Sequence, residues 1–261
     1  MTTWTVTSTA DLLLGAEDRR EDVEPVTDAW PDLDLETAYR VQDETLARRV
    51  ARGEVVTGVK LGLTSRAKQQ RMGVDSPLTA WLTDAMTLPS GDPVVVGDLI
   101  HPRVEPEIVF VLGRPLRGPG ISAAQALGAV DQVLAGIEVI DSRYRDFRFR
   151  LPDVVADNAS SGKVVTGSVS LPPSALDLAL EACVLEVDGE VVHTATGAAV
   201  QGHPAEALAL AANTLGRRGI TLEAGWTVFT GGMTDAVAIA PGSHVVASFT
   251  HLGDVVLGAV D

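Results

Sequence analysis

The chain has 261 residues, 46% of them hydrophobic, and carries a formal net charge of −15 at pH 7. This length is enough for one large domain, alone or with a small helical extension, and this hydrophobic content excludes a disordered chain. The acidic balance argues against a nucleic-acid-binding protein, which needs a basic surface, and against a protein that binds anionic membranes.

The sequence shows no signal for export or membrane insertion. Residues 1–22 contain no basic region followed by a long apolar core, so no secretory signal is predicted. No run approaches the ~20 apolar residues that span a bilayer. The single cysteine, Cys183, excludes an intrachain disulfide and a cysteine-based zinc cluster, and its apolar neighbours predict a core strand. A cytoplasmic protein is expected.

The first clear element in chain order is a helix over residues 34–52. Asp34 can cap its N-terminus and Gly53 can end it. Its apolar residues fall near one stripe, which is expected to face the core: Leu35, Tyr39, Leu46 and Val50. Residues 1–55 are therefore predicted to form a helical N-terminal portion that is compact with the remainder, residues 56–261.

Strands are predicted to dominate from residue 56 onward. Residues 55–64 form a strand candidate that carries Lys60, a short polar helix is expected at 65–73, and several strands are expected between 88 and 112. A helix is predicted over 122–136, because Ser122 and Gln125 have capping-box spacing and apolar residues follow at helical spacing. This helix is expected to stop at Gly136, directly before a strand that carries Glu138.

The C-terminal half is also rich in strand signals. Asp188 and Gly189 lie between two β-rich runs and predict a hairpin. Residues 203–219, with Pro204 in the first turn, predict a helix, and residues 226–260 predict strands and tight turns. Because the strands do not alternate regularly with long helices, a doubly wound Rossmann sheet is not expected, and the pattern favours an α+β fold.

Two glutamates lie inside an apolar strand candidate, residues 101–113, with the sequence HPRVEPEIVFVLG. Side chains alternate along a strand, so Glu105 and Glu107 share one face, where like charges repel and burial is costly. Pro106 favours an exposed edge strand as the explanation, because proline is confined to edges, strand starts and bulges. A third carboxylate, Glu138, changes this interpretation, because it lies among isoleucine and valine residues. Three carboxylates on strands predict an all-oxygen site for Mg²⁺ or Mn²⁺.

Other residues are out of place in a similar way. Lys60 lies in an apolar, glycine-rich strand, either as a side chain that reaches water or as a cation that meets a substrate carboxylate. The polar cluster at 157–161 is either a turn or a part of the site. Gly231 and Gly232 either allow a close backbone approach or form a plain loop.

Six segments in the same order resemble a bacterial family that contains the 2-keto-4-pentenoate hydratases and the 4-oxalocrotonate decarboxylases, within the fumarylacetoacetate hydrolase superfamily. They are GVKLGLTSRAKQQRMGVDSP, HPRVEPEIVFVLG, IEVIDSRY, DVVADNASS, QGHPAEAL and TGGMTDAVAIAPG. The resemblance covers the chain from about residue 9 to the end. It implies a mixed β-roll, a Mg²⁺ or Mn²⁺ site at Glu105, Glu107 and Glu138, and an active-site lysine at Lys60.

Within this family the sequence is closer to the decarboxylases. The resemblance implies that the hydratases have the motif GVD-x-P-D, with an acidic residue just after the proline. In this chain Leu78 occupies that position, and leucine cannot transfer a proton. The expected reaction is the metal-dependent decarboxylation of 2-oxohex-3-enedioate to 2-hydroxypenta-2,4-dienoate. The remaining site residues expected from the resemblance are Asp157 and Ser161 in catalysis, and Leu63, Ser160, Gly231 and Gly232 in substrate binding.

Several alternatives remain open at this point. One is a 2-keto-4-pentenoate hydratase, and another is an acylpyruvate-type C–C hydrolase that would need a general base such as His251 or His101. A third is a non-catalytic subunit that stabilises a hydratase assembly. The resemblance also suggests a complex with a partner hydratase, and a homo-oligomer is possible.

Overall fold

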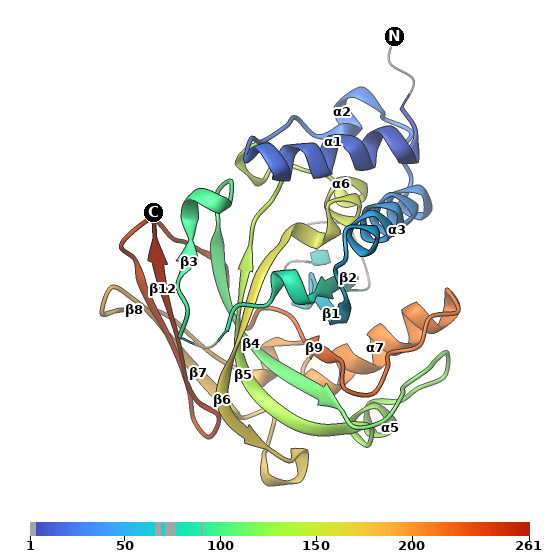
Figure 1. Cartoon of the computed structure of the whole chain (residues 1–261). Helices are drawn as coiled ribbons and strands as arrows, with labels where there is room; N and C mark the ends of the chain where they lie inside the picture. The colour runs from blue at the N-terminus through green and yellow to red at the C-terminus, as the bar shows by residue number, and fades with distance from the viewer. Residues whose placement is uncertain (1–3, 66–68, 71–76, 90) are drawn as a thin grey trace.

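The computed structural model describes residues 4–65, 69–70, 77–89 and 91–261. Helices gather at the N-terminal end, where α1, α2 and α3 lie together with α6 at the top of Figure 1. Their bounds are Val6–Arg19, Val26–Ala29, Leu35–Ala51 and Leu151–Ala156. The predicted helical N-terminal portion is confirmed. In the described part of the chain, no helix has the length and apolar character needed to cross a membrane.

Two sheets form the rest of the molecule. In the described part of the chain, the larger sheet has seven strands in the order β2-β1-β9-β4-β5-β6, with β10 also paired to β4. Its strands are β1 (Val56–Gly62), β2 (Leu78–Thr83), β4 (Arg103–Leu112), β5 (Val130–Ile140), β6 (Ser161–Leu171), β9 (Thr227–Phe229) and β10 (Val237–Ala238). Among them, β1 and β9 are parallel, whereas β4, β5 and β6 are antiparallel.

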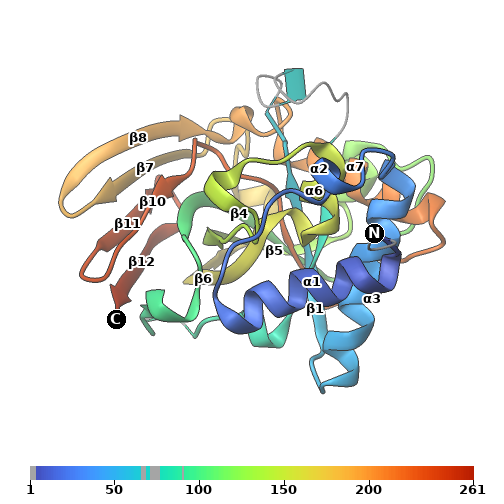
Figure 2. The same ribbon diagram turned by 90° about the horizontal axis from the view of Figure 1, so that it is seen from above.

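The second sheet has the order β3-β12-β11-β7-β8. Its strands, which lie side by side in Figure 2 apart from β3, are β3 (Val94–Val95), β7 (Ala182–Val187), β8 (Glu190–Thr196), β11 (His244–Phe249) and β12 (Gly253–Val260). The predicted hairpin at Asp188 and Gly189 is confirmed as the β7–β8 turn. Cys183 is buried on β7, as predicted.

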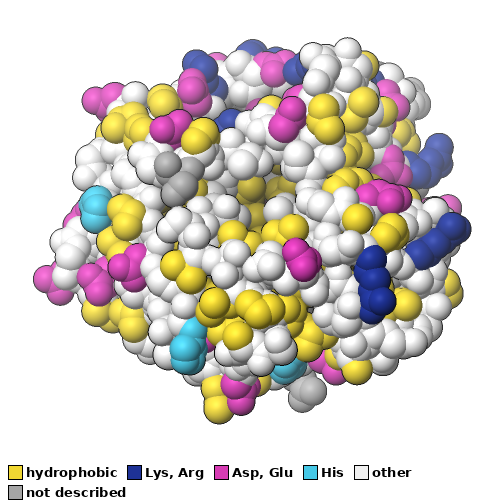
Figure 3. All heavy atoms as spheres, turned by 60° about the horizontal axis from the view of Figure 1, so that its bottom comes forward, with side chains coloured by type: hydrophobic (Ala, Val, Ile, Leu, Met, Phe, Trp, Pro, Cys, Tyr) yellow, Lys and Arg dark blue, Asp and Glu magenta, His cyan; other side chains and the backbone are white. Residues whose placement is uncertain are grey.

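The main hydrophobic core lies between the two sheets and under helix α7 (Pro204–Arg217). Helix α7 is the helix predicted over residues 203–219, and it contributes Leu208, Ala211 and Leu215 to this core. On the face at the bottom of Figure 1, apolar side chains line a hollow near the middle and charged side chains lie around it (Figure 3). A second core cluster joins Leu13 of α1 and Val41 of α3 to Tyr144 and Val155, so the N-terminal helices share their core with the segment around α6.

Two expectations about helices were wrong. The helix predicted over 122–136 is only α5 (Ala123–Leu127), with the predicted capping box of Ser122 and Gln125, and strand β5 begins already at Val130. Pairing with β4 along ten residues overrides the local helical pattern there. In α3, Leu35 and Val50 of the predicted apolar stripe are exposed, and smaller or polar side chains are buried in their place: Ala38, Val41, Gln42 and Thr45. The short helix predicted at 65–73 falls largely outside the described residues.

Candidate active site

Three glutamates meet on one face of the larger sheet. Glu105 and Glu107 are on the same face of β4, and Glu138 is directly opposite Glu105 on β5. One carboxylate oxygen from each of the three lies within 4.8 Å of the others, and all three side chains are buried. The predicted carboxylate cluster therefore exists in the fold.

The electrostatics of this cluster fit a divalent cation. Burial, together with the charges of Glu138 and Glu105, holds the pKa of Glu107 well above its usual range. Burial also raises the pKa of Glu138, although Lys60 opposes the shift. Among the described residues, Oε1 of Glu107 has no hydrogen-bond partner. A hard cation with oxygen ligands would satisfy this atom and neutralise the repulsion, so Mg²⁺ or Mn²⁺ suits the residues present.

Two glycines lie directly against these carboxylates. The backbone N–H of Gly231 donates to Oε2 of Glu107 at 2.7 Å. The φ of Gly231 is +110°, and a Cβ there would collide with Thr64, while a Cβ at Gly232 would collide with the carboxylate of Glu105. The loop therefore approaches the site as closely as the double glycine indicated. A role of Gly231 and Gly232 in substrate binding stays a prediction.

Pro106 does not mark an exposed edge. Strand β4 lies between β5 and the strands β9 and β10. Strand β9 pairs with residues 109–111 and β10 with residues 103–104. Pro106 lies in the gap between them, where its carbonyl accepts from the N–H of Met233 at 2.9 Å. A residue without an N–H fits this gap, so the edge-strand interpretation of the glutamates is wrong.

Lys60 belongs to the same cluster. Its side chain is only 3% exposed, and its Nζ lies 3.1 Å from Oε1 of Glu138. The same Nζ donates to the carbonyl of Ala159 at 2.8 Å. The alternative of a lysine that reaches water is therefore wrong, and the cation points into the carboxylate site from β1.

An unusual turn presents the Ala159 carbonyl to Lys60. Asn158, Ala159 and Ser160 all have positive φ, at 48°, 49° and 58°, which is costly for residues other than glycine. The carboxamide of Asn158 compensates by binding both backbone groups of Trp81: Oδ1 accepts from its N–H at 2.8 Å, and Nδ2 donates to its carbonyl at 2.9 Å. Sequence reasoning identified the polar cluster but not this attachment to the edge strand β2.

Asp157 and Ser161, the other predicted catalytic residues, contact the same turn. Burial raises the pKa of Asp157 to about 6, although Arg143 opposes the shift. The Asp157 carboxylate accepts from Nε of Arg143 and from Oγ of Ser160 at 3.3 Å. Oγ of Ser161 donates to the carbonyl of Asn158 at 2.8 Å. These contacts hold the turn in place, and the catalytic roles of Asp157 and Ser161 stay predictions.

Arg143 is a residue that sequence reasoning missed. It is 4% exposed, and besides Asp157 its guanidinium binds the carbonyls of Asp141 and Ser161, at 2.7 and 2.8 Å. The signal that could have found it is an arginine two residues after the buried segment GIEVID, where a cation needs several acceptors.

Leu63 and Leu78 lie at the side of the site formed by β1 and β2. Leu78 is 4% exposed and pairs with Gly62, two positions along from the Lys60–Ala80 pair, so its side chain is on the same face as Lys60. Leu63 has a φ of +57° and packs against the apolar cluster of the N-terminal helices. Its predicted contact with substrate stays a prediction. Residues 71–76, which complete the GVDSPL motif, are outside the described part of the chain.

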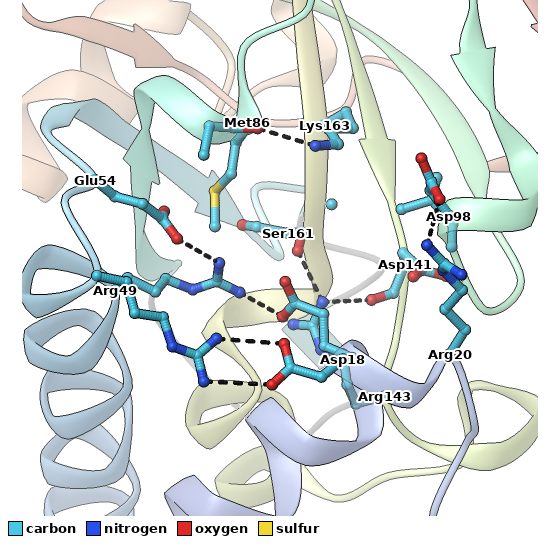
Figure 4. A pocket seen from close by; sticks show the side chains of 15 residues that line it. Asp18, Arg20, Arg49, Glu54, Met86, Asp98, Asp141, Arg143, Ser161 and Lys163 are labelled. Atoms are coloured by element: carbon cyan, nitrogen blue, oxygen red, sulfur yellow. Dashed lines mark hydrogen bonds and ion pairs between the residues drawn. The ribbon is translucent and has the colours of Figure 1, made fainter.

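A separate charged cavity of about 390 Å³ lies between the N-terminal helices and the larger sheet (Figure 4). Its charges are paired within its own wall, for example Arg20 with Asp98 and Arg52 with Asp18. None of the three glutamates lines it. Several charges of this cavity are therefore paired in its own wall, and Lys163, which also lines it, donates to the carbonyl of Ala85.

The two histidines considered as general bases are engaged elsewhere. Nδ1 of His251 lies 2.7 Å from the buried carboxylate of Glu181. The ring of His101 stacks on Phe147, with 4.8 Å between the ring centroids. Neither contact directs an imidazole toward the three glutamates, which disfavours the hydrolase alternative.

Comparison with known sequences identifies relatives over most of the chain. Residues 53–257 match the family model of the fumarylacetoacetate (FAA) hydrolase C-terminal domain. A 4-oxalocrotonate decarboxylase from Pseudomonas sp. (strain CF600) is 44% identical over 247 residues, which are 95% of this chain and 94% of the relative. A 2-hydroxyhexa-2,4-dienoate hydratase from Comamonas testosteroni is 40% identical over 222 residues, which are 84% of each chain.

A solved structure also matches this chain over its whole length. The structure of 4-oxalocrotonate decarboxylase from Pseudomonas putida G7, complexed with magnesium and adipate, matches with a TM-score of 0.94 and 40% identity over 100% of both chains. This match and the family model confirm the predicted α+β fold with its β-roll and helical N-terminal portion. The chain belongs to the fumarylacetoacetate hydrolase family.

Proposed function

We propose that this protein is a metal-dependent 4-oxalocrotonate decarboxylase, which converts 2-oxohex-3-enedioate to 2-hydroxypenta-2,4-dienoate and CO₂. The observation that carries the proposal is the buried cluster of Glu105, Glu107 and Glu138 with Lys60 beside it. Support also comes from the likeness to a decarboxylase at 44% identity over 95% of the chain.

Each of these residues has a distinct role in the proposed reaction. Glu105, Glu107 and Glu138 would hold Mg²⁺ or Mn²⁺, which when bound supplies Lewis-acid chemistry at the 2-oxo group of the substrate. Nζ of Lys60 lies 3.1 Å from Glu138, so it would stabilise negative charge that develops on the 2-oxo oxygen. Because Lys60 is held by Glu138 and by the Ala159 carbonyl, it needs little reorganisation during the reaction.

The electron flow is balanced without an external oxidant or base. The bond between the distal carboxylate and the adjacent methylene carbon breaks, and CO₂ leaves. The electron pair of the broken bond forms a new C=C bond with the neighbouring carbon. The existing C=C bond shifts toward the 2-oxo carbon, and the carbonyl pair moves onto the 2-oxo oxygen, which gives a dienolate. Protonation of that oxygen gives the 2-hydroxydienoate. The site only has to favour charge at the oxygen, which suits a site where Lys60 and a bound divalent metal would together offset the three carboxylates and interact with that oxygen.

Leu78 favours decarboxylation over water addition. Its apolar side chain lies on the Lys60 face of β1 and β2. The hydratase motif GVD-x-P-D has an acidic residue at this position. A leucine neither activates water nor donates a proton. A hydratase is the second candidate, because a hydratase relative is also 40% identical to this chain.

The two candidates are separated by one experiment. The purified protein with Mg²⁺ is supplied with 2-oxohex-3-enedioate, and CO₂ release is measured. It is then supplied with 2-hydroxypentadienoate, and formation of 4-hydroxy-2-oxovalerate is measured. Decarboxylation alone supports the proposal, whereas water addition without CO₂ release replaces it with the hydratase. Full activity after removal of metal by EDTA would contradict the metal role.

We also propose where the protein acts. The dienol product is unstable, so the expected partner is a 2-keto-4-pentenoate hydratase that consumes this product within a complex. A homo-oligomer is a second expected assembly. The expected location is the cytoplasm. We further propose that residues 1–55 and residues 56–261 work as one compact unit, which the shared core cluster supports.

A further inference from the structure

Arg103 is the first residue of β4 and shares a face with two of the glutamates. The pairing of β4 with β5 is regular from Arg103 to Glu107, so side chains alternate without interruption and Arg103, Glu105 and Glu107 point to the same side. Two residues of an antiparallel strand span about 7 Å. A cation therefore stands one side-chain position beyond the carboxylate cluster.

The guanidinium of Arg103 is held by an aromatic ring and not by an acid. Its Cζ lies 4.0 Å from the centroid of the Phe147 ring. In the part of the chain that the structure describes, Arg103 makes no ion pair or hydrogen bond through its side chain, whereas most other arginines there do. Stacking on a ring occupies the face of a guanidinium and leaves the N–H groups at its edge available.

The ring is fixed by a strained and anchored loop. Asp146 and Phe147 have positive φ, at 57° and 54°, and such strain persists only where surrounding contacts impose it. Arg145 and Arg148, on either side, form ion pairs with acidic residues of the N-terminal portion: Asp22, Glu24 and Asp28. The N-terminal portion thus holds Phe147 against Arg103.

The site becomes more open in the direction of Arg103. Glu107 is 0% exposed, Glu138 is 1% exposed and Glu105 is 8% exposed. Arg103, the next residue on this face, is half-buried. A ligand that binds at the cluster with one end would extend past Glu105 and reach the guanidinium with the other.

We infer that Arg103 binds the distal carboxylate of an extended 2-oxo dicarboxylic acid and selects it over the monocarboxylic acid of the same length. The inference rests on the proposed function, because it names the residue that recognises the far end of that substrate. A guanidinium and a carboxylate form a charge-assisted pair that is often bidentate. The rise of about 7 Å between Arg103 and Glu105 along β4 is comparable with the length of such a chain.

This contact has a consequence for turnover. The distal carboxylate is the group that leaves as CO₂, so the contact exists in the bound substrate and disappears in the product. Arg103 therefore raises the affinity for substrate without holding the monocarboxylic product. Because the paired charge diminishes in the transition state, loss of Arg103 raises KM and does not lower kcat.

The test compares two ligands that differ only at the far end, 2-oxoadipate and 2-oxohexanoate. Their dissociation constants are measured by calorimetry on the Mn²⁺-loaded protein, for the unaltered chain and for Arg103→Met. The unaltered protein should prefer 2-oxoadipate by about ten- to a hundredfold, the range for a hydrogen-bonded charged group. Arg103→Met should abolish this preference, because it weakens the binding of 2-oxoadipate and leaves that of 2-oxohexanoate unchanged. Arg103→Lys should restore part of the preference.

The controls separate this inference from the proposed function. Arg117→Met removes an exposed arginine beyond the other end of β4 and should leave the preference unchanged. If both ligands bind equally to the unaltered protein, or if the preference survives Arg103→Met, the inference is overturned while the metal site stands. If neither 2-oxo acid binds the metal-loaded protein, the proposed function itself fails.

Discussion

At the scale of single residues, Glu107 is the most constrained of the three glutamates. It is fully buried, one oxygen accepts the Gly231 N–H, and the other has no hydrogen-bond partner among the described residues. A carboxylate in this position is costly to the fold unless a cation is bound. The cluster therefore destabilises the metal-free protein and, for the same reason, increases its affinity for the ion.

Glu107→Gln tests this relation. The variant should bind Mn²⁺ at least roughly tenfold more weakly, since even changes around the ligands of a metal reduce affinity by this factor. The metal-free variant should unfold at a higher temperature than the metal-free parent, because a repelled buried charge is removed. Calorimetric titration and thermal unfolding measure the two effects. Glu190→Gln, at an exposed position, should change neither, and an unchanged Mn²⁺ affinity in Glu107→Gln would remove the metal site.

Lys60→Met should separate catalysis from metal binding. The substitution removes the cation 3.1 Å from Glu138, so turnover should fall by about a hundredfold or more, the effect of losing one preorganised donor to a developing oxyanion. Mn²⁺ affinity should not fall, because a competing positive charge is gone. Turnover with 2-oxohex-3-enedioate and Mn²⁺ titration provide the measurements. A parallel loss of both would show that Lys60 merely supports the fold of the cluster.

At the scale of elements, the chain shows which features are visible in sequence. Glu138 was identifiable because a charge among isoleucine and valine is out of place, and helix α7 followed from Pro204 in its first turn. Strand β5 was not identifiable at residues 130–136, because alanine, leucine and glutamine follow a true capping box and the pairing with β4 decides the structure. The roles of Asn158 and Arg103 depend on Trp81 and Phe147, which are distant in sequence, so no local pattern reveals them.

The turn at 157–161 depends on Arg143 in the same way. Arg143→Met would leave Asp157 buried without a cation and remove the donor to three carbonyls, those of Asp141, Asp157 and Ser161. Loss of one partner of a buried ion pair costs about 3–5 kcal/mol, so the free energy of unfolding should fall by that amount in urea titrations. Arg145→Met removes only exposed ion pairs, so it should lower the free energy of unfolding far less than Arg143→Met does. Equal effects of the two substitutions would contradict a special role for the buried arginine.

At the scale of the whole molecule, the N-terminal helices and the sheet support one site together. Val23 exchanges backbone hydrogen bonds with Arg143 and Arg145, and the acidic residues that follow it anchor the loop of Phe147. The same segment leads through α6 to the turn that holds Lys60. The helical portion therefore fixes both the cation of the cluster and the arginine at its far end, although it contributes none of the three glutamates.

The stability of the whole protein should carry the signature of Asp157. Its pKa is raised from 3.8 to about 6 in the folded state, so between about pH 4 and pH 6 the folded protein binds this proton more tightly than the unfolded chain does. The contribution is fully present below the unfolded pKa and is lost as the pH rises through about 6. The difference in unfolding free energy between the parent and Asp157→Asn should therefore decrease by roughly 3 kcal/mol across this window and stay constant above it. Urea unfolding of both proteins at a series of pH values gives the difference curve, in which effects of the other carboxylates cancel. A difference that is constant from pH 4 to pH 7, or that increases with pH, would mean that the ion pair with Arg143 outweighs burial and keeps the pKa of Asp157 at or below its ordinary value.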